Sequence, residues 1–185
     1  MNVIETELPG VLIVEPKVFG DERGFFMETW HAERYEEAGL PKDFVQDNLS
    51  FSQRGILRGL HFQNPDQQGK LVYVLQGEVY DVAVDIRVGS PTFGEWTAVT
   101  LSSENKRQVY VPEGFAHGFL VTSDMALFAY KCTAKYNAKA ETSVLWNDPK
   151  IAIEWPIDAP VLSEKDRVAS PLAELPPERL PYYES

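Results

Sequence analysis

The sequence predicts an all-β protein, built as an antiparallel sandwich or barrel with a few short helices. Short apolar runs recur along the 185 residues, and Gly, Pro, Asn or Asp separates each run from the next. Within "EVYDVAVDIRV", residues 78–88, successive side chains fall on two contrasting faces with the period of two that is typical of a strand. One stretch alone has a convincing helical pattern. Many short strands with few helices favour this class over an α/β fold.

The predicted strands follow the apolar runs. They are Val11–Val14, Phe25–Thr29, Val45–Phe51, Ile56–Gln63, Lys70–Leu75, Glu78–Arg87, Trp96–Leu101, Gln108–Val111, His117–Val121 and Ala126–Thr133. Gln76-Gly77 lies between two of them, a pattern that indicates a hairpin.

The strand at 78–88 predicts two different faces. Tyr80, Val82, Val84, Ile86 and Val88 share the first face, and Val79, Asp81, Ala83, Asp85 and Arg87 share the second. The second face is polar enough to meet water or to line a cavity.

The helical stretch is "HAERYEEAGLP", in which helix formers run to Ala38 and Gly39 is the expected C-terminal cap. His31 opens this helix and is predicted to lie on the surface. The length predicts a single domain over residues 1–185 with a Pro-rich tail from about residue 170. The tail is expected to pack as a short helix or extended segment, or to stay mobile.

The formal net charge of −11 argues against generic nucleic-acid binding, because the chain repels phosphate backbones. No apolar run approaches a membrane span, no secretory signal is visible, and Cys132 is the only cysteine. A cytoplasmic protein is therefore expected. Basic residues nevertheless lie in the strand-like middle, which indicates a small anionic ligand; they are Arg23, Arg54, Arg58, Lys70 and Arg87.

A motif between two predicted strands sharpens the fold. "VPEGFAHGFLV" places Pro112, Gly114 and His117 in a pattern that resembles the second sequence motif of cupins, which are small jelly-roll barrels. In metal-binding cupins the first motif carries two histidines one residue apart, but here Gln63 takes the second position. The chain has only 3 histidines, so no metal site is predicted.

Several longer stretches resemble one family, the dTDP-4-dehydrorhamnose 3,5-epimerases, which are metal-free, cupin-like enzymes of dTDP-L-rhamnose biosynthesis. The matching stretches are "DERGFFMETW", "FVQDNLSFSQRGILRGLHFQ", "QGKLVYVLQGEVYDVAVDIRVGSPTFGEW", "VPEGFAHGFLV", "YKCTAKYNAKAE" and "LSEKD". They cover almost the whole chain from Val11 to Asp166. The resemblance implies a cupin-like jelly roll that epimerises a dTDP-sugar at C3 and C5.

The resemblance also implies roles for individual residues. His61 matches the general base, Asp166 its carboxylate partner, Tyr130 the proton donor on the opposite face of the sugar, and Lys70 the cation near the carbonyl oxygen. Tyr136 matches the ring that stacks on thymine. Other residues match contacts to the nucleotide, pyrophosphate and sugar; they are Arg23, Glu28, Gln46, Asp47, Asn48, Arg58, His117, Glu141 and Lys165.

The family further implies a homodimer in which "DERGFF" reaches into the neighbouring subunit's site, so Phe19, Arg23, Phe26 and Glu28 would serve the partner's substrate. The chemistry fits these residue types. Protons at C3 and C5 are acidified by the C4 ketone, and inversion needs a base, an opposite acid and a group that stabilises the enolate. Such a reaction needs no metal and no redox cofactor.

The residues themselves leave other interpretations open. His61 could be a core histidine bonded to a carbonyl, Asp166 could cap a turn, and Tyr130 and Tyr136 could be ordinary strand aromatics. Arg23 could pair with Asp21 or Glu22 on the surface. Glu141 and Lys165 could be exposed charges, and His117 could orient other groups instead of reacting.

Two further questions concern geometry and reaction. Period-two counting places Arg58 and His61 on opposite faces of their strand unless the strand bulges. The alternative functions are epimerisation at one carbon only, a non-catalytic cupin that binds a sugar nucleotide or another anion, and a metal-dependent cupin enzyme, which Gln63 disfavours.

Overall fold

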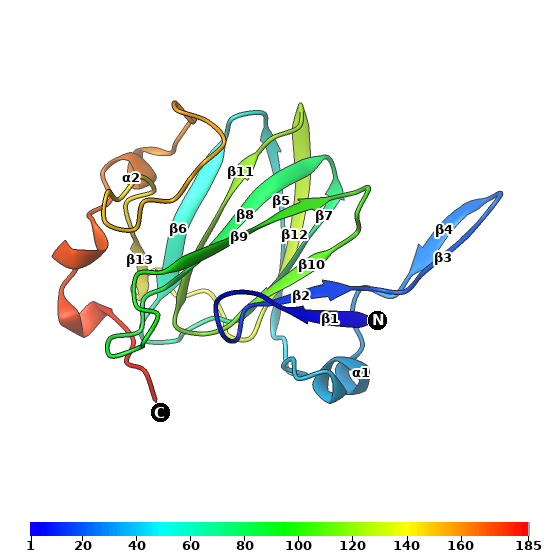
Figure 1. Ribbon diagram of the computed structural model, residues 1–185, viewed down its shortest axis with the longest axis horizontal. Helices are drawn as coiled ribbons and strands as arrows, with labels where there is room; N and C mark the ends of the chain where they lie inside the picture. Colours follow the sequence, from blue (N-terminus) through cyan, green and yellow to red (C-terminus); the bar gives the residue numbers. More distant parts are fainter. Residues whose placement is uncertain (185) are drawn as a thin grey trace.

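The computed structural model of the protein describes residues 1–184, in which two large antiparallel sheets pack face to face (Figure 1). The six-stranded sheet has the order β1 (Asn2–Glu5), β2 (Leu12–Glu15), β10 (Gln108–Val111), β7 (Lys70–Gln76), β12 (Met125–Cys132), β5 (Gln46–Gln53). The five-stranded sheet has the order β13 (Glu141–Ser143), β6 (Leu57–Gln63), β11 (Phe115–Val121), β8 (Glu78–Asp85), β9 (Trp96–Ser102). The predicted all-β, cupin-like fold is confirmed.

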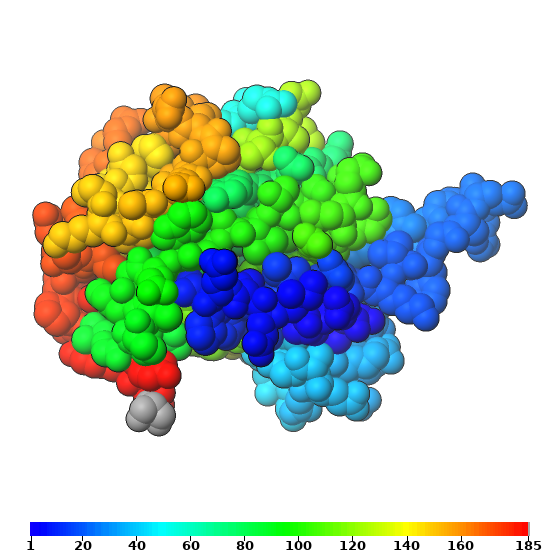
Figure 2. Space-filling view, viewed as in Figure 1, coloured from blue at the N-terminus to red at the C-terminus, as the bar shows by residue number. Residues whose placement is uncertain are grey.

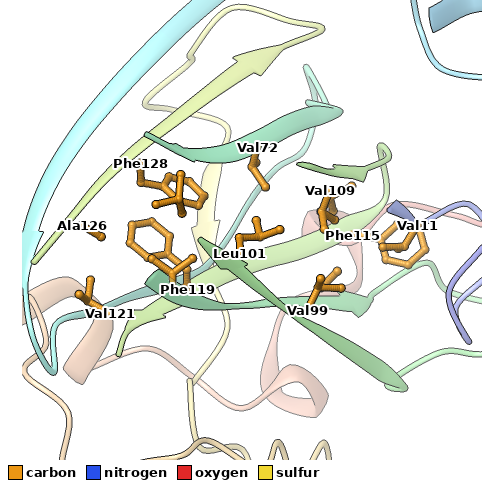
Figure 3. Close-up of a cluster of buried hydrophobic side chains, with 14 of the residues drawn as sticks. Val11, Val72, Val99, Leu101, Val109, Phe115, Phe119, Val121, Ala126 and Phe128 are labelled. Carbon is orange, nitrogen blue, oxygen red and sulfur yellow. The ribbon is translucent and has the colours of Figure 1, made fainter. Parts of the chain in front are cut away.

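The core between the sheets comes from the inward-facing positions of both. Val79 and Ala83 of β8 pack in this cluster with Val72 of β7 and Phe128 of β12. Figure 3 shows Val72 and Phe128 with other members of the cluster. Full burial of a side chain of this kind stabilises the fold by about 1.5–3 kcal/mol. The apolar cluster fills one part of the barrel and leaves the polar inward positions of β5, β6 and β7 to line the rest.

The outer face of the five-stranded sheet is also buried. Val82 and Val84 of β8, and Ile86 just after it, pack with Leu172 and Leu180 of the C-terminal segment. The face prediction for residues 78–88 is thus confirmed, and both faces are covered. The tail contains two short 3₁₀ turns, Leu172–Glu174 and Pro177–Arg179, and it lies beside β6 and β13 (Figure 1).

The helix prediction is confirmed with a small shift. Helix α1 (Ala32–Glu37) buries Tyr35 against the six-stranded sheet. His31 is half-buried and caps the helix, because its Nδ1 accepts a hydrogen bond from the Arg34 amide at 3.4 Å. Ala38 is the C-terminal cap residue, and Gly39 follows it at φ +86°. No helix within residues 1–184 has the length and hydropathy needed to cross a membrane.

The hairpin predicted at Gln76-Gly77 is wrong. The turn exists, but β7 pairs with β10 and β12 while β8 pairs with β9 and β11, so the chain crosses from one sheet to the other at Gly77. A side chain at Gly77 would collide with the Met125 carbonyl oxygen, at 1.9 Å from the added carbon. The glycine therefore serves a crossover between sheets.

Three strands were not predicted from the pattern: β1, β13 and β3 (Val18–Asp21). Strand β3 pairs only with β4 (Gly24–Met27), and this hairpin projects away from the body of the molecule (Figures 1 and 2). Phe19, Phe25 and Phe26 on it are 54%, 61% and 70% exposed, so within one chain the hairpin has no core of its own.

Candidate active site

A cavity of about 160 Å³ opens between the two sheets, next to the apolar core. Its lining residues come from β5, β6, β7, β11 and β12; they are Ser50, Arg58, His61, Lys70, His117, Phe119, Phe128 and Tyr130. A second hollow of about 530 Å³ adjoins it, because Arg58 and His61 line both, and Lys165 and Asp166 line its far side. The barrel thus brings one acid–base set of side chains to one opening.

A β-bulge brings Arg58 and His61 to the same cavity. Strand β11 pairs His117 with His61 and Phe119 with Arg58, so two steps on β11 match three steps on β6. The bulge needs glycine at the contact: a Cβ on Gly59, at φ +139°, would lie 2.5 Å from the Gly118 Cα. This answers the question left by period-two counting, since the extra residue turns His61 inward.

His61 and Asp166 form a tight pair at the cavity wall. Nε2 of His61 lies 2.6 Å from Oδ1 of Asp166, and because a carboxylate only accepts, the ring N–H donates. Asp166 is 2% exposed and lies in helix α2 (Glu164–Arg167), whose N-terminal cap is Ser163. The capping role considered for Asp166 is therefore wrong. Nδ1 of His61 has no protein hydrogen-bond partner among the described residues.

The pair has a consequence for acid stability. Burial raises the pKa of Asp166, but the hydrogen bond and charge of His61, with the Ser163 and Gly59 contacts, outweigh burial and hold the pKa below its usual range. The folded state therefore binds fewer protons than the unfolded state as the pH falls through about 4. The stabilisation is complete above that pH and is lost progressively as the pH falls from there toward the lowered pKa of the folded state.

We expect Asp166→Asn to lower the free energy of unfolding by about 1.5–3 kcal/mol at pH 7, because it removes a charge-assisted hydrogen bond. At pH 3 the difference from the native protein should shrink, because the carboxyl of the unfolded chain then takes up a proton and part of the stabilisation is lost. Urea unfolding of both proteins at the two pH values measures this. An equal difference at pH 3 and pH 7 would contradict the stated cause.

Lys70 and Tyr130 contribute two further polar groups to the cavity. Burial lowers the pKa of Lys70, and this effect is larger than the opposite effect of nearby Cys132, Asp81 and Glu141. Within residues 1–184 the Lys70 amino group has no hydrogen-bond or ion-pair partner. Burial also raises the pKa of Tyr130, which keeps the phenol protonated, while the Arg58 charge pulls in the other direction. The amino group of Lys70 and the phenol of Tyr130 thus face the same space as His61.

A second His–Asp pair lies deeper in the barrel. Nε2 of His117 lies 3.0 and 2.9 Å from the two carboxylate oxygens of Asp81, and both residues are buried. For Asp81 the sequence pattern predicted only that it lies on the more polar face of its strand. Its pairing with His117 follows from the register of β8 and β11, which no local pattern reveals.

Polar side chains continue from the cavity to the surface. The Tyr136 hydroxyl donates to Glu141 at 3.1 Å, and Lys165 lies 2.9 Å from the same carboxylate oxygen. Burial raises the pKa of Glu141, but Lys165 and Tyr136 hold it below its usual range. Gln46 accepts from the Tyr136 amide at 2.8 Å and donates to Asn48 at 3.1 Å. These five predicted residues therefore lie together.

Other predicted residues lie away from this cavity in a single chain. Arg23 pairs with Asp21, Glu28 pairs with Arg34, and both lie on or next to the projecting hairpin with Phe19 and Phe26. Asp47 faces outward and pairs with Lys131 at 2.8 Å.

The idea that five cations share one anion site needs correction. Arg54 pairs with Asp124 at the surface, and Arg87 pairs with buried Asp85 and lies over the rings of Phe115 and Tyr183. Only Arg58 and Lys70 of that set line the cavity. Within residues 1–184 no three His, Cys, Asp or Glu side chains gather in a way that could hold a metal ion.

Comparison with known proteins identifies the family. A profile of the dTDP-4-dehydrorhamnose 3,5-epimerases matches residues 5–174. The chain belongs to the dTDP-4-dehydrorhamnose 3,5-epimerase family. An epimerase of that name from Shigella flexneri is 61% identical over 168 residues, which cover 90% of this chain and 93% of the relative.

Solved structures agree with this membership. The dTDP-6-deoxy-D-glucose-3,5-epimerase of Legionella pneumophila Philadelphia 1, in complex with dTDP-4-keto-L-rhamnose, is 56% identical with a TM-score of 0.97 and covers 100% of this chain and 99% of that one. A 3′-monoepimerase of Streptomyces bikiniensis, in complex with dTDP-quinovose, is 37% identical with a TM-score of 0.89 and covers 96% and 92%. The fold of this chain is therefore shared by a solved 3,5-epimerase and by a solved 3′-monoepimerase.

Proposed function

We propose that the chain inverts C3 and C5 of dTDP-4-dehydro-6-deoxy-D-glucose and so forms dTDP-4-dehydro-L-rhamnose. The observation that carries this proposal is the convergence of the His61–Asp166 pair, Lys70 and Tyr130 on one cavity. Family membership supports the substrate class, since similar chains bear the 3,5-epimerase name.

The reaction is a pair of proton transfers next to a ketone. Nδ1 of His61 removes the proton from C3 or C5, the C–H electrons form an enolate, and the Lys70 ammonium stabilises the oxygen at C4. Tyr130 gives a proton to the same carbon from the opposite face, which inverts it and leaves a phenolate beside an imidazolium. Exchange with water returns Tyr130 to the phenol and His61 to the neutral imidazole. Only protons move in these steps, so the reaction requires no oxidant or reductant.

Asp166 is proposed to hold His61 in the required tautomer. Because the carboxylate accepts from Nε2–H, Nδ1 is left without a proton and can act as the base. The same charge stabilises the imidazolium that forms. His117 and its Asp81 partner are proposed to contact the sugar from the floor of the cavity.

The nucleotide is proposed to lie along the polar residues between the cavity and the surface. Tyr136 would stack on thymine, Arg58 and Lys165 would meet the pyrophosphate, and Gln46, Asn48 and Glu141 would fix the nucleoside. A guanidinium meets phosphate oxygens through two parallel N–H groups, which suits Arg58 to this position.

We propose a homodimer in which the β3–β4 hairpin enters the partner's site with Phe19, Arg23, Phe26 and Glu28. In the same dimer, outward-facing Asp47 is also proposed to contribute to nucleotide binding. The hairpin exposes aromatic rings beyond the body of the chain (Figure 1). On the six-stranded sheet, Leu49, Phe51 and Leu75 are 62%, 54% and 51% exposed. Contiguous exposed apolar side chains of this kind mark interfaces.

Subunit mixing tests the shared site. We expect Arg23→Ala and His61→Asn to be inactive separately and to regain activity when they are mixed and allowed to exchange subunits. Each mixed dimer has one intact site, so recovery should approach about a quarter of native activity at random exchange. Recovery of nothing, with mixed dimers verified by mass spectrometry, would show that Arg23 serves its own chain's site.

Replacing Lys70 by Met is expected to lower kcat by about 10²–10³-fold, the usual effect of losing one group that stabilises an oxyanion. The same change should raise the melting temperature, because it removes an unpaired cation from the barrel. Steady-state kinetics and thermal unfolding measure the two effects, with exposed Lys150→Met as the control. A less stable variant would contradict the stated environment of Lys70.

The test of the proposed function is proton NMR in D₂O with dTDP-4-dehydro-6-deoxy-D-glucose. The native protein should introduce deuterium at both C3 and C5 and form the L-rhamno product. Binding of the substrate without any exchange would overturn the proposal in favour of a non-catalytic cupin. A requirement for added iron, zinc or manganese would point instead to a metal-dependent cupin.

A second candidate is epimerisation at one carbon, which the shared fold of the Streptomyces bikiniensis 3′-monoepimerase favours. The same acid–base pair suits both reactions. The NMR experiment separates them, because a single-site epimerase would introduce deuterium at only one of C3 and C5. We also propose a cytoplasmic location and a single domain over residues 1–185.

A further inference from the structure

Gln63 occupies the position that a metal-ligating histidine has in metal-binding cupins, and here its carboxamide is fully engaged. Nε2 donates to the carbonyl oxygens of Asp66 at 2.7 Å and Lys135 at 3.3 Å, and Oε1 accepts from the Asn137 amide at 2.9 Å. Gln63 is 5% exposed and follows His61 by two residues on β6. One buried side chain therefore joins the segment after β6 to the segment after β12.

Tyr136 lies between the two residues that Gln63 holds. Its amide donates to Gln46, and its hydroxyl donates to Glu141, but its side chain is 54% exposed. The backbone on both sides of the tyrosine is thus fixed by the Gln63 carboxamide at Lys135 and Asn137. The exposed ring owes its position to these polar contacts and not to packing in the core.

We propose that Gln63 is a positioning residue for nucleotide binding, which holds the Lys135–Asn137 backbone so that the Tyr136 ring is in place before the nucleotide arrives. The inference rests on the proposed function, in which Tyr136 stacks on thymine. Base–aromatic stacking contributes most to affinity when the ring is already placed, because the cost of ordering a loose ring on binding is subtracted from it.

The glutamine carboxamide can make all three of these hydrogen bonds, whereas a glutamate or alanine side chain at the same position cannot. It offers two donors and an acceptor in one plane, and the site presents two carbonyls and one amide. A glutamate of the same size would direct an oxygen at the Asp66 and Lys135 carbonyls. An alanine would leave three backbone groups without partners.

The test combines binding with a double-mutant cycle. For Gln63→Ala and Gln63→Glu we expect the Kd of dTDP by calorimetry, and the KM of the dTDP-sugar, to rise about tenfold, with kcat changed less than about twofold. In a Tyr136→Ala background, Gln63→Ala should cause no further loss of dTDP affinity, because its effect acts through the ring.

The controls separate positioning from folding. Asn105→Ala removes another carboxamide that joins Thr100, Ser102 and Arg107 in a loop away from the cavity, and it should leave the Kd of dTDP unchanged. Thermal unfolding confirms that each variant is folded; if Gln63→Ala is not, Gln63→Glu carries the cycle with Tyr136→Ala.

The outcomes distinguish this inference from the proposed function. Additive losses in the cycle, or a fall in kcat with Kd unchanged, would overturn the role of Gln63 even in an active enzyme. Absence of solvent exchange in the native protein would instead overturn the proposed reaction. The dTDP cycle would still test Gln63, since it does not depend on turnover.

Discussion

Replacing His61 by Asn is expected to lower kcat by about 10²–10⁴-fold, the contribution typical of a positioned general base. The amide keeps a polar group beside Asp166 but cannot accept a proton at working pH. Deuterium uptake from D₂O should therefore fall at both C3 and C5, while the Kd of dTDP stays close to the native value. NMR exchange rates and calorimetry measure the two quantities.

Two matched variants define what the His61 result means. His31→Asn changes the histidine that caps α1 for another good cap residue, so we expect native exchange rates. Asp166→Asn should reduce exchange at both carbons together, because it disturbs the tautomer of one shared base. If His61→Asn kept native exchange at one carbon, a second base would have to serve that carbon, and His117 with Asp81 would be the candidate.

The strands were predictable where burial on one side repeats every two residues. Strand β8 follows this pattern, with Val79 and Ala83 in one core and Val82 and Val84 in the other. Strands β1 and β13 contain no buried residue, so no run of buried apolar positions reveals them, whereas β2 and β10 contain buried apolar residues and were predicted at a length of 4 residues. The turn at Gly77 could not show that its two strands enter different sheets, because that depends on packing across the barrel.

The site was predictable mainly through family resemblance, since the geometry depends on long-range contacts. His61 and Asp166 are 105 residues apart, and only the position of α2 against β6 joins them. The bulge at Gly59 decides that Arg58 and His61 share a cavity, and period-two counting alone predicts the opposite. Charge patterning likewise could not separate Lys70 in the cavity from Arg87 in its pair with Asp85.

Gln63 shows a different limit of sequence reasoning. Its place in the cupin motif indicates only that a metal ligand is absent. Its three hydrogen bonds appear when the segments around Asp66 and Asn137 are brought together, and neither segment is near the other in sequence. Motif comparison thus identifies a ligand type that this position lacks, while the fold shows the contacts that the side chain makes.

Replacing Tyr130 by Phe is expected to lower epimerisation by about 10²–10⁴-fold without an equal loss of proton removal. His61 and Lys70 still form the enolate, but no acid delivers a proton from the opposite face. The enolate is then reprotonated by the imidazolium, which exchanges with D₂O. We therefore expect deuterium to enter with retention of configuration, and NMR with product analysis measures exchange and inversion separately.

This separation of exchange from inversion is a stronger test of the two-sided mechanism than loss of activity. Tyr80→Phe provides the matched control, because Tyr80 packs against Trp155 on the outer face of β8 and should leave both rates unchanged. A Tyr130→Phe enzyme that loses exchange and inversion in equal measure would place Tyr130 in proton removal or in sugar binding. Retained exchange at C3 or C5 with no inversion would instead show that the base and the acid act from opposite faces of one ring, as the cavity between β6 and β12 allows.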